Sequence, residues 1–160
     1  MMIKTTDLCD KLMEAARVFK PIFQDFGSVT SFEGEAVTVK CFEDNSRIKE
    51  LSATPGKGKI LVVDGGGSDR CALLGDVIAA DLAKNGWAGA VVYGYVRDKD
   101  VLATIDLGIK ALGCMPMKSL KRNEGTVGAT VNMAGQNVLS GEYIYADSDG
   151  ILVIDAPTRL

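Results

Sequence analysis

Apolar residues near the start of the chain recur every three or four positions, which is the spacing of one helix face. The recurring positions are Leu8, Leu12, Ala15, Ala16 and Phe19. This periodicity predicts a helix over residues 5–19, with Thr6 or Asp7 as its capping residue and Pro21 as its end.

Farther along, runs with strand character alternate with helical segments. From Phe32 to Phe42 apolar and polar residues alternate, which indicates a strand. Short continuous apolar runs rich in β-branched residues are typical of buried parallel strands. Such strands are predicted at 60–63, 88–96 and 109–115. Helices are predicted from the cluster Asp44-Asn45-Ser46 to residue 52, from beyond Ser68 to Asn85-Gly86, and over about 100–107.

After residue 128 the pattern changes to short β segments. They cover 129–133, 138, 143–146 and 151–154, and Gly135, Gly141 and Gly150 lie between them. Asp147-Ser148-Asp149-Gly150 is expected to be a turn before the last strand. A βαβ-rich middle followed by a β-rich end predicts an α/β fold in a single compact domain spanning residues 1–160.

Composition and charge exclude several function classes. Of the 160 residues 47% are hydrophobic and 24% charged, and 18 Lys and Arg against 21 Asp and Glu give a net charge of -3. This balance offers no electrostatic footprint for direct nucleic-acid binding. No apolar stretch is long enough to span a membrane, and no signal-peptide core follows the N-terminus. The four cysteines are widely spaced, so we expect reduced thiols and a cytoplasmic protein.

The sequence contains no histidine. The usual general base and every Ser-His or Cys-His pairing are therefore excluded, as are zinc sites built on imidazole. A metal ion bound here would be held by oxygen ligands, which favours a hard divalent cation such as Mg²⁺ or Mn²⁺.

Arg97 and Asp98 directly follow the predicted strand 88–96, at the end where α/β sheets bind ligands. The carboxylate suits a hard cation and the guanidinium suits an anionic substrate. Gly75 interrupts a helical pattern just before Asp76, which indicates a helix N-terminus whose amides bind carboxylates or phosphates. The alternatives are a surface ion pair with Asp98 as a helix cap, and a packing glycine followed by a first-turn acid.

Glycine is concentrated in the run Asp64-Gly65-Gly66-Gly67-Ser68. This run matches neither a P-loop nor a dinucleotide-binding motif, so nucleotide binding is not supported. Two interpretations stay open: the backbone amides line a site, or the loop is a tight connection that needs positive φ angles.

The spacing of the charged groups resembles a known motif. Gly75-Asp76, the twenty residues from Val77 to Val96, and then Arg97-Asp98 match the D-x20-R-D motif of class II aldolases acting on 4-hydroxy-4-methyl-2-oxoglutarate. Their superfamily includes the regulator of ribonuclease activity A (RraA), and the resemblance to its short members covers nearly the whole chain. The segments that carry this resemblance are Thr6-Asp7-Leu8-Cys9-Asp10, Val37-Thr38-Val39-Lys40-Cys41-Phe42-Glu43-Asp44-Asn45, Leu61-Val62-Val63-Asp64-Gly65-Gly66-Gly67, Asn85-Gly86-Trp87-Ala88-Gly89 and Ala146-Asp147-Ser148-Asp149-Gly150.

The resemblance implies an RraA-like sandwich, similar to swivelling phosphohistidine domains, and a homotrimer with sites between subunits. It implies that Asp98 binds a divalent cation (Mg²⁺, Mn²⁺ or Co²⁺) and that Asp76 orients a water on that ion. Arg97 would stabilise the enolate that develops from a 2-oxo acid substrate. The groups expected to hold the substrate carboxylate are the backbone amides of Gly75, Asp76, Val77 and Ile78.

The implied activity is that of a carbon–carbon lyase, which cleaves 4-hydroxy-4-methyl-2-oxoglutarate to pyruvate and decarboxylates oxaloacetate through the same enolate. The alternative is an RraA-type regulator that binds and inhibits RNase E without catalysis. A domain with only a structural role is a further interpretation. The chain keeps every charged member of the aldolase motif, which favours the enzyme.

Overall fold

Four parallel strands form the centre of the main sheet. They are β3 (Phe32–Lys40), β4 (Lys59–Asp64), β6 (Gly89–Val96) and β7 (Gly108–Cys114). Their register places Val62 beside Val91 and Val92 beside Ala111, so apolar side chains meet across each strand pair. Continuous apolar runs are stable here because both faces of the strands are covered. The predicted central strands are therefore confirmed to within one or two residues at each end.

The computed structural model describes residues 2–158, and within this range ten strands join in one mixed sheet. Its order is β1-β12-β11-β3-β4-β6-β7-β2, with β5 on β6 and β8 on β3, while β9 and β10 form a separate pair. These outer strands are β1 (Arg17–Val18), β2 (Gln24–Asp25), β5 (Ala72–Leu74), β8 (Thr126–Val127), β9 (Val131–Met133), β10 (Gln136–Val138), β11 (Tyr143–Asp147) and β12 (Gly150–Ile154).

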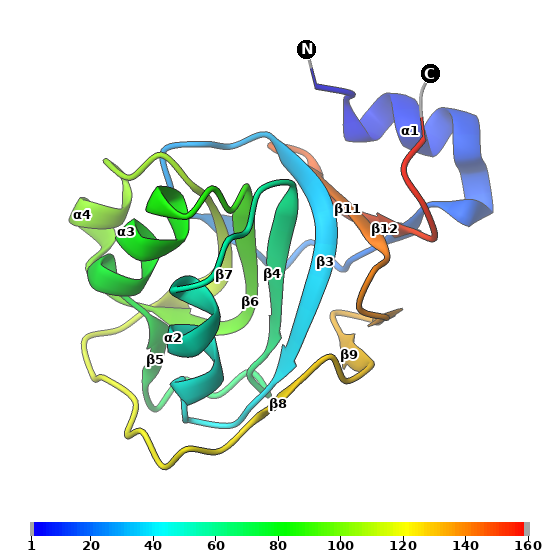
Figure 1. Ribbon diagram of the computed structural model, residues 1–160. Coiled ribbons are helices and arrows are strands. Elements are labelled where there is room, and N and C mark those ends of the chain that lie inside the picture. The colour runs from blue at the N-terminus through cyan, green and yellow to red at the C-terminus, as the bar shows by residue number, and fades with distance from the viewer. Residues whose placement is uncertain (1, 159–160) are drawn as a thin grey trace.

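Three helices cover one face of the parallel strands (Figure 1). They are α2 (Ser46–Ser52), α3 (Asp76–Lys84) and α4 (Lys99–Leu102). Each lies between two strands in sequence, because parallel neighbours need a crossover connection. Ile48, Leu82 and Leu102 project from these helices into a fully buried cluster with Leu61 and Val92 of the sheet. No helix within residues 2–158 is long and apolar enough to cross a bilayer.

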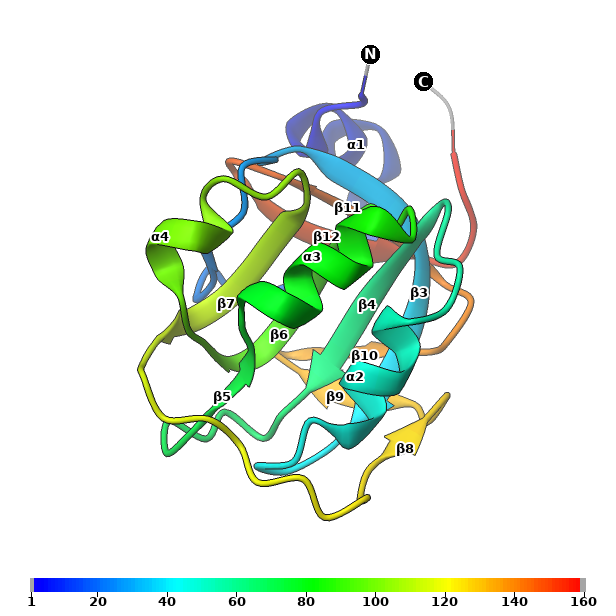
Figure 2. The same cartoon turned by 60° about the vertical axis from the view of Figure 1, so that its left-hand side comes forward.

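The opposite face of the sheet carries a second buried cluster. It joins Phe32 and Val62 of the parallel strands to Val131, Val138 and Ile144 of the C-terminal β segments. The apolar positions of this β-rich end are therefore explained by packing across the sheet. Figure 2 shows β9 and β10 on the side of the sheet away from α2 and α3.

The sheet is curled, so that a side chain of β7 reaches the end of β11. The buried amine of Lys110 on β7 donates to the backbone carbonyl of Asp147 at the end of β11, 2.6 Å away. The same amine forms an ion pair with Asp25 on β2 at 3.1 Å. A buried cation is tolerated only when it is paired and hydrogen-bonded, and both conditions hold here.

The first helix is shorter than the periodicity predicts. Helix α1 (Thr5–Leu12) is followed by a 3₁₀ turn and then by β1, so the predicted helix over residues 5–19 is wrong in its second half. Met13 has φ 51°, which takes the chain out of the helix well before Pro21. The N–H of Phe19 donates to Ile151, and its ring joins the second buried cluster.

The prediction that Thr6 or Asp7 caps this helix is wrong, because both residues lie inside α1. The cap comes from Asp147, whose carboxylate accepts hydrogen bonds from the N–H of Thr5 at 2.8 Å and from its hydroxyl at 2.7 Å. Asp147 also begins the predicted turn, because its Oδ1 accepts from the N–H of Asp149 at 2.9 Å. One carboxylate thus serves both the turn and a helix 142 positions away.

Other differences are local. The segment beyond Ser68 is not helical throughout: it forms β5 first, and α3 begins only at Asp76. Ala72–Leu74 is a three-residue apolar run, which periodicity does not distinguish from a turn of buried helix. Helix α4 covers residues 99–102 instead of 100–107, and β1, β2 and β8 are too short to give a sequence signal. Helix α3 ends at Asn85 and Gly86, as predicted, and Gly86 has a positive φ angle of 86°.

Candidate active site

The two charged motifs meet at one edge of the sheet. Strand β5 runs parallel to β6, with Leu74 beside Val96, so Gly75 and Arg97 leave the sheet side by side. The N–H of Arg97 donates to the carbonyl of Leu74 at 3.0 Å. This is the carboxyl edge of the parallel strands, where α/β sheets bind their ligands.

Asp98 is turned toward helix α3. Its Oδ2 accepts a hydrogen bond from the N–H of Asp76 at 3.0 Å, and the Nε of Arg97 lies 3.9 Å from the same oxygen. Asp98 occupies the residue before α4, yet its side chain makes no capping bond to that helix. Its backbone has φ 61° and ψ 41°, a left-handed conformation that is unusual for a residue with a side chain. Asp98 is therefore the N-cap residue of α4 by position, but its carboxylate does not cap that helix.

Gly75 makes this approach possible. A Cβ on Gly75 would lie 2.7 Å from Oδ2 of Asp98 and 3.2 Å from Cγ of Arg97. Its φ of -130° is accessible to any residue, so space and not backbone conformation requires glycine here. The break in the helical pattern at this position thus reports a close contact with the charged pair.

The N-terminus of α3 already holds carboxylates. The N–H of Asp76 is bound by Asp98, and the N–H of Val77 donates to Oδ1 of Asp76 at 2.8 Å. Ile78 supplies the next amide of this first turn. Exposed helix N-termini bind carboxylates through such amides and through the helix dipole. Two of the amides predicted to bind substrate are therefore engaged by the protein's own acids.

A shallow depression opens beside the charged pair, with a volume of about 310 Å³. Its lining residues are Arg97, Asp98, Lys99, Cys114, Met115 and Pro116. The side chains of Arg97 and Asp98 are 39% and 34% exposed, so both are accessible to a small molecule. The sequence motif does not include Lys99, Cys114 or Met115. Lys99 directly follows Asp98, whereas Cys114 and Met115 reach the depression because β7 ends beside β6 at the same edge of the sheet.

The site offers few carboxylates to a divalent cation. Within residues 2–158 no group of three or more Cys, Asp or Glu side chains converges as a metal site. Asp98 offers one accessible carboxylate. Asp76 lies next to it, because its backbone N–H donates to that carboxylate. Mg²⁺ commonly keeps several waters and takes only one or two protein carboxylates together with the substrate. The residues therefore fit a hydrated ion that is bound in part by substrate, and they do not form an all-protein cage.

The triple-glycine loop has a conformational role. Gly66 and Gly67 have φ 67° and 71°, which residues with side chains rarely adopt. The N–H groups of Gly65 and Gly67 both donate to the carbonyl of Tyr93, and that of Gly66 donates to Asp64. These amides are used inside the connection, so the interpretation as a tight turn is favoured over an anion-binding loop.

Comparisons with known proteins place the chain in a family. The sequence model of the RraA-like family, described as Aldolase/RraA, matches residues 5–153. A protein of Alkalilimnicola ehrlichii, provisionally named 4-hydroxy-4-methyl-2-oxoglutarate aldolase, is 56% identical over 153 residues, which cover 96% of this chain and 95% of the relative. The structure of the RNA-processing inhibitor RraA from Thermus thermophilis has a TM-score of 0.95 and 39% identity, covering 99% of this chain and 96% of that chain.

A third similar protein carries a different name. The structure of the S-adenosylmethionine:2-dimethylmenaquinone methyltransferase from Geobacillus kaustophilus has a TM-score of 0.95 and 37% identity, covering 97% of this chain and 96% of that chain. These three similar proteins carry three different functional names, so the activity of this chain has to be argued from its site residues. The predicted α/β fold with RraA-like architecture is confirmed, and the chain belongs to the RraA-like family.

Proposed function

We propose that this protein is an aldolase that cleaves 4-hydroxy-4-methyl-2-oxoglutarate into two molecules of pyruvate. The observation that carries the proposal is the convergence of Arg97, Asp98 and the N-terminus of α3 at the carboxyl edge of the sheet. A cation, an acid and the N-terminal end of a helix together match a small 2-oxo acid.

The reaction needs charge stabilisation at one oxygen. A proton leaves the C4 hydroxyl, the C3–C4 bond breaks, and its electron pair moves to the C2 keto oxygen. One pyruvate leaves as the new carbonyl compound, and the enolate of the other is protonated at C3. Arg97 lines the depression, and its guanidinium stabilises the enolate oxygen. Asp76, whose Oδ1 is held by the N–H of Val77, orients the water that accepts the hydroxyl proton.

Asp98 is the residue that would hold a divalent cation, with Mg²⁺ or Mn²⁺ as the expected ions and Co²⁺ as a substitute. Such an ion would serve as a Lewis acid toward the 2-oxo acid. The contact of Asp98 with the N–H of Asp76 fixes the carboxylate, so its orientation does not depend on the ion.

The same enolate makes oxaloacetate decarboxylation the expected second activity. Loss of CO₂ from oxaloacetate leaves its bonding electrons on the pyruvate fragment, and Arg97 stabilises that charge in the same place. Pyruvate release from each substrate, measured with Mg²⁺ or Mn²⁺ and then with excess EDTA, tests the proposal. Release that EDTA removes and added metal restores supports it, and absence of release from both substrates in every metal would refute it.

Regulation of RNase E is the second candidate function. It is favoured by the likeness to RraA of Thermus thermophilis, named an RNA-processing inhibitor, over nearly the whole of both chains. Inhibition of RNase E through surface contact would not need Arg97. An RNase E cleavage assay with wild type and Arg97→Ala therefore separates this role from catalysis: equal inhibition by the two proteins, with no pyruvate release by wild type, favours the regulator.

A further inference from the structure

A larger depression lies beyond the candidate active site, with a volume of about 580 Å³. We call it the Phe42 depression. Its lining residues are Phe42, Glu43, Arg70, Cys71, Met117, Lys118, Leu120, Arg122 and Glu124. Met115 and Pro116 line the candidate active site and Met117 and Lys118 line this depression, so the two hollows are neighbours along one segment of chain. The proposed aldolase chemistry uses none of its residues.

One wall is fixed by an ion pair. Glu43 accepts two hydrogen bonds from the guanidinium of Arg70, at 2.5 and 2.8 Å, and a third from the hydroxyl of Ser68 at 2.6 Å. The guanidinium of Arg70 also lies over the ring of Phe42, 5.9 Å from its centre. The charges of Glu43 and Arg70 therefore offset each other, and neither is available to a ligand as a free charge.

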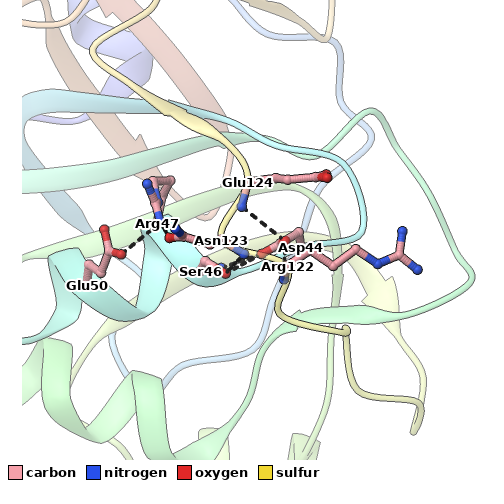
Figure 3. A network of polar contacts seen from close by, with 7 residues as sticks. All are labelled: Asp44, Ser46, Arg47, Glu50, Arg122, Asn123 and Glu124. Atoms are coloured by element: carbon pink, nitrogen blue, oxygen red, sulfur yellow. Dashed lines mark hydrogen bonds and ion pairs between the residues drawn. The ribbon is translucent and has the colours of Figure 1, made fainter.

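The facing wall is fixed by a buried carboxylate (Figure 3). Oδ2 of Asp44 accepts from the N–H of Arg122 at 2.6 Å and of Glu124 at 3.3 Å. Its Oδ1 accepts from the N–H and hydroxyl of Ser46 at 2.8 and 2.6 Å, at the start of α2. The carbonyl of Met117 accepts from Ala72 of β5 at 2.7 Å. Both walls are thus preorganised, which lowers the cost of binding.

The backbone of Arg122 is bound to Asp44, but its side chain extends away from that carboxylate (Figure 3). Neither Arg122 nor Lys118 forms an ion pair with any residue in the described part of the chain. Arg122 lies close enough to Glu43 for its charge to help lower the pKa of that carboxyl, after the larger effects of the Arg70 and Ser68 hydrogen bonds. Two cations without ion-pair partners therefore border the depression, with Glu124 as the one unpaired acid among its lining residues.

The rest of the lining is apolar and open. Phe42, Met117 and Leu120 are 57%, 61% and 60% exposed, and each would lose water contact on meeting an apolar partner. The depression thus combines two cations that have no ion-pair partner with an exposed apolar surface. This combination suits a ligand that is apolar at one end and anionic at the other.

We propose that the Phe42 depression binds a small carboxylate with an aryl or branched alkyl body. The body lies against Phe42, Met117 and Leu120, and the carboxylate is bound by Lys118 and Arg122. The size of the hollow suits a compound larger than pyruvate, within the usual range of small-molecule sites. This site is separate from the proposed aldolase site, so it stands whether or not the chain cleaves 2-oxo acids.

Titration of the full chain with phenylacetate, followed by the amide signals of residues 117–124 in NMR spectra, tests the proposal. Phenylacetamide, which has the same ring and no charge, is the matched probe. The variant Lys118→Ala/Arg122→Ala removes both cations, and Lys121→Ala is its control because Lys121 lies on the same loop outside the depression. Phe42→Ala removes the apolar floor, and since Phe42 is largely exposed this variant is expected to fold.

Saturable binding of phenylacetate is expected in wild type and in Lys121→Ala. We expect it to weaken about tenfold or more in the double variant and in Phe42→Ala, and to be weaker by a similar factor for phenylacetamide. Equal affinity for the two probes, or equal affinity in the double variant and its control, overturns the proposal. Absence of saturable binding also overturns it, including the case in which sedimentation shows that a second copy of the chain covers the depression.

Discussion

The carboxylate of Asp98 and the backbone N–H of Asp76 are hydrogen-bonded at 3.0 Å, although they lie 22 positions apart in the chain. The bond joins the end of β6 to the first turn of α3, and it exists because Gly75 leaves room for it. An acid that could have capped its own helix instead holds the start of another. The proposed site is therefore one unit, in which each member sets the position of the next.

Replacing Asp98 by Asn tests whether its charge is needed. The amide oxygen can still accept from Asp76, so the local geometry and the unfolding midpoint should stay close to wild type. Loss of the charged ligand should lower pyruvate release by ~10²–10³-fold, the usual cost of removing one preorganised electrostatic group. Urea denaturation of Asp98→Asn is the control. If the variant lost activity together with most of its free energy of unfolding, the assigned role of Asp98 would be contradicted.

Replacing Arg97 by Lys separates charge from shape. The lysine keeps a positive charge but lacks the planar fork that binds two oxygens at once. We expect kcat to fall by ~10-fold in Arg97→Lys and by ~10²–10³-fold in Arg97→Ala, for both substrates alike. The side chain is partly exposed, so circular dichroism should show an unchanged fold. An Arg97→Ala protein with wild-type kcat would remove arginine from the mechanism.

Gly75→Ala should damage the site without altering its charged groups. The new methyl would lie 2.7 Å from Oδ2 of Asp98, so the carboxylate or the start of α3 has to move. A displacement of about 1 Å at a catalytic group can cost ~10²-fold in rate. Pyruvate release is the measurement, and Lys84→Ala, an exposed substitution on the same helix, is the control. Equal rates in the two variants would show that the close approach has no catalytic importance.

Asp147 makes stability depend on pH. Burial acts to raise the pKa of Asp147, but hydrogen bonds from Thr5 and the following turn outweigh it, so the pKa lies below its ordinary value of 3.8. The ionised form is bound more favourably in the folded state, so this stabilisation is present above the ordinary pKa and is lost as the pH falls through the lowered one. Asp147→Ala should cost about 1–2 kcal/mol at pH 7, as helix caps do.

Urea denaturation of Asp147→Ala and wild type at pH 7 and pH 3 measures this difference. It should shrink at the lower pH, and Asp10→Ala, an exposed acid on α1, should show little effect at either pH. A difference between Asp147→Ala and wild type that does not change with pH would rule out the ionised cap.

Asp44→Ala should release the wall of the Phe42 depression. Burial acts to raise the pKa of Asp44, but bonds from Ser46, Arg122 and Glu124 lower it to about 2. Its stabilisation is therefore fully present at neutral pH and is lost as the pH falls from 3.8 toward 2. Without the carboxylate, hydrogen exchange at the amides of Arg122 and Glu124 should quicken by ten-fold or more, roughly the loss of one charged hydrogen bond. Unchanged exchange at both amides would contradict this anchoring.

The sequence predicts those features that depend on local pattern. The β-branched runs at 60–63 and 88–96 identify the central strands, and the break at Gly75 marks the start of a helix where the chain meets the charged pair. Features set by distant partners are missed. The cap on α1 comes from Asp147, and β5 is a strand only because β6 lies beside it. Cys114 joins the site because β7 ends beside β6, which no spacing within one motif reveals.

Helix α1 depends on groups that the chain contains only near its other end. Thr5 needs the carboxylate of Asp147, and Leu8 packs against Tyr145 and Leu152. Because synthesis runs from the amino end toward the carboxyl end, α1 leaves the ribosome before β11 and β12 and can dock only after those strands have emerged. Until then the nascent chain carries α1 as an undocked amphipathic segment, and its docking waits for the strands that supply Tyr145, Asp147 and Leu152.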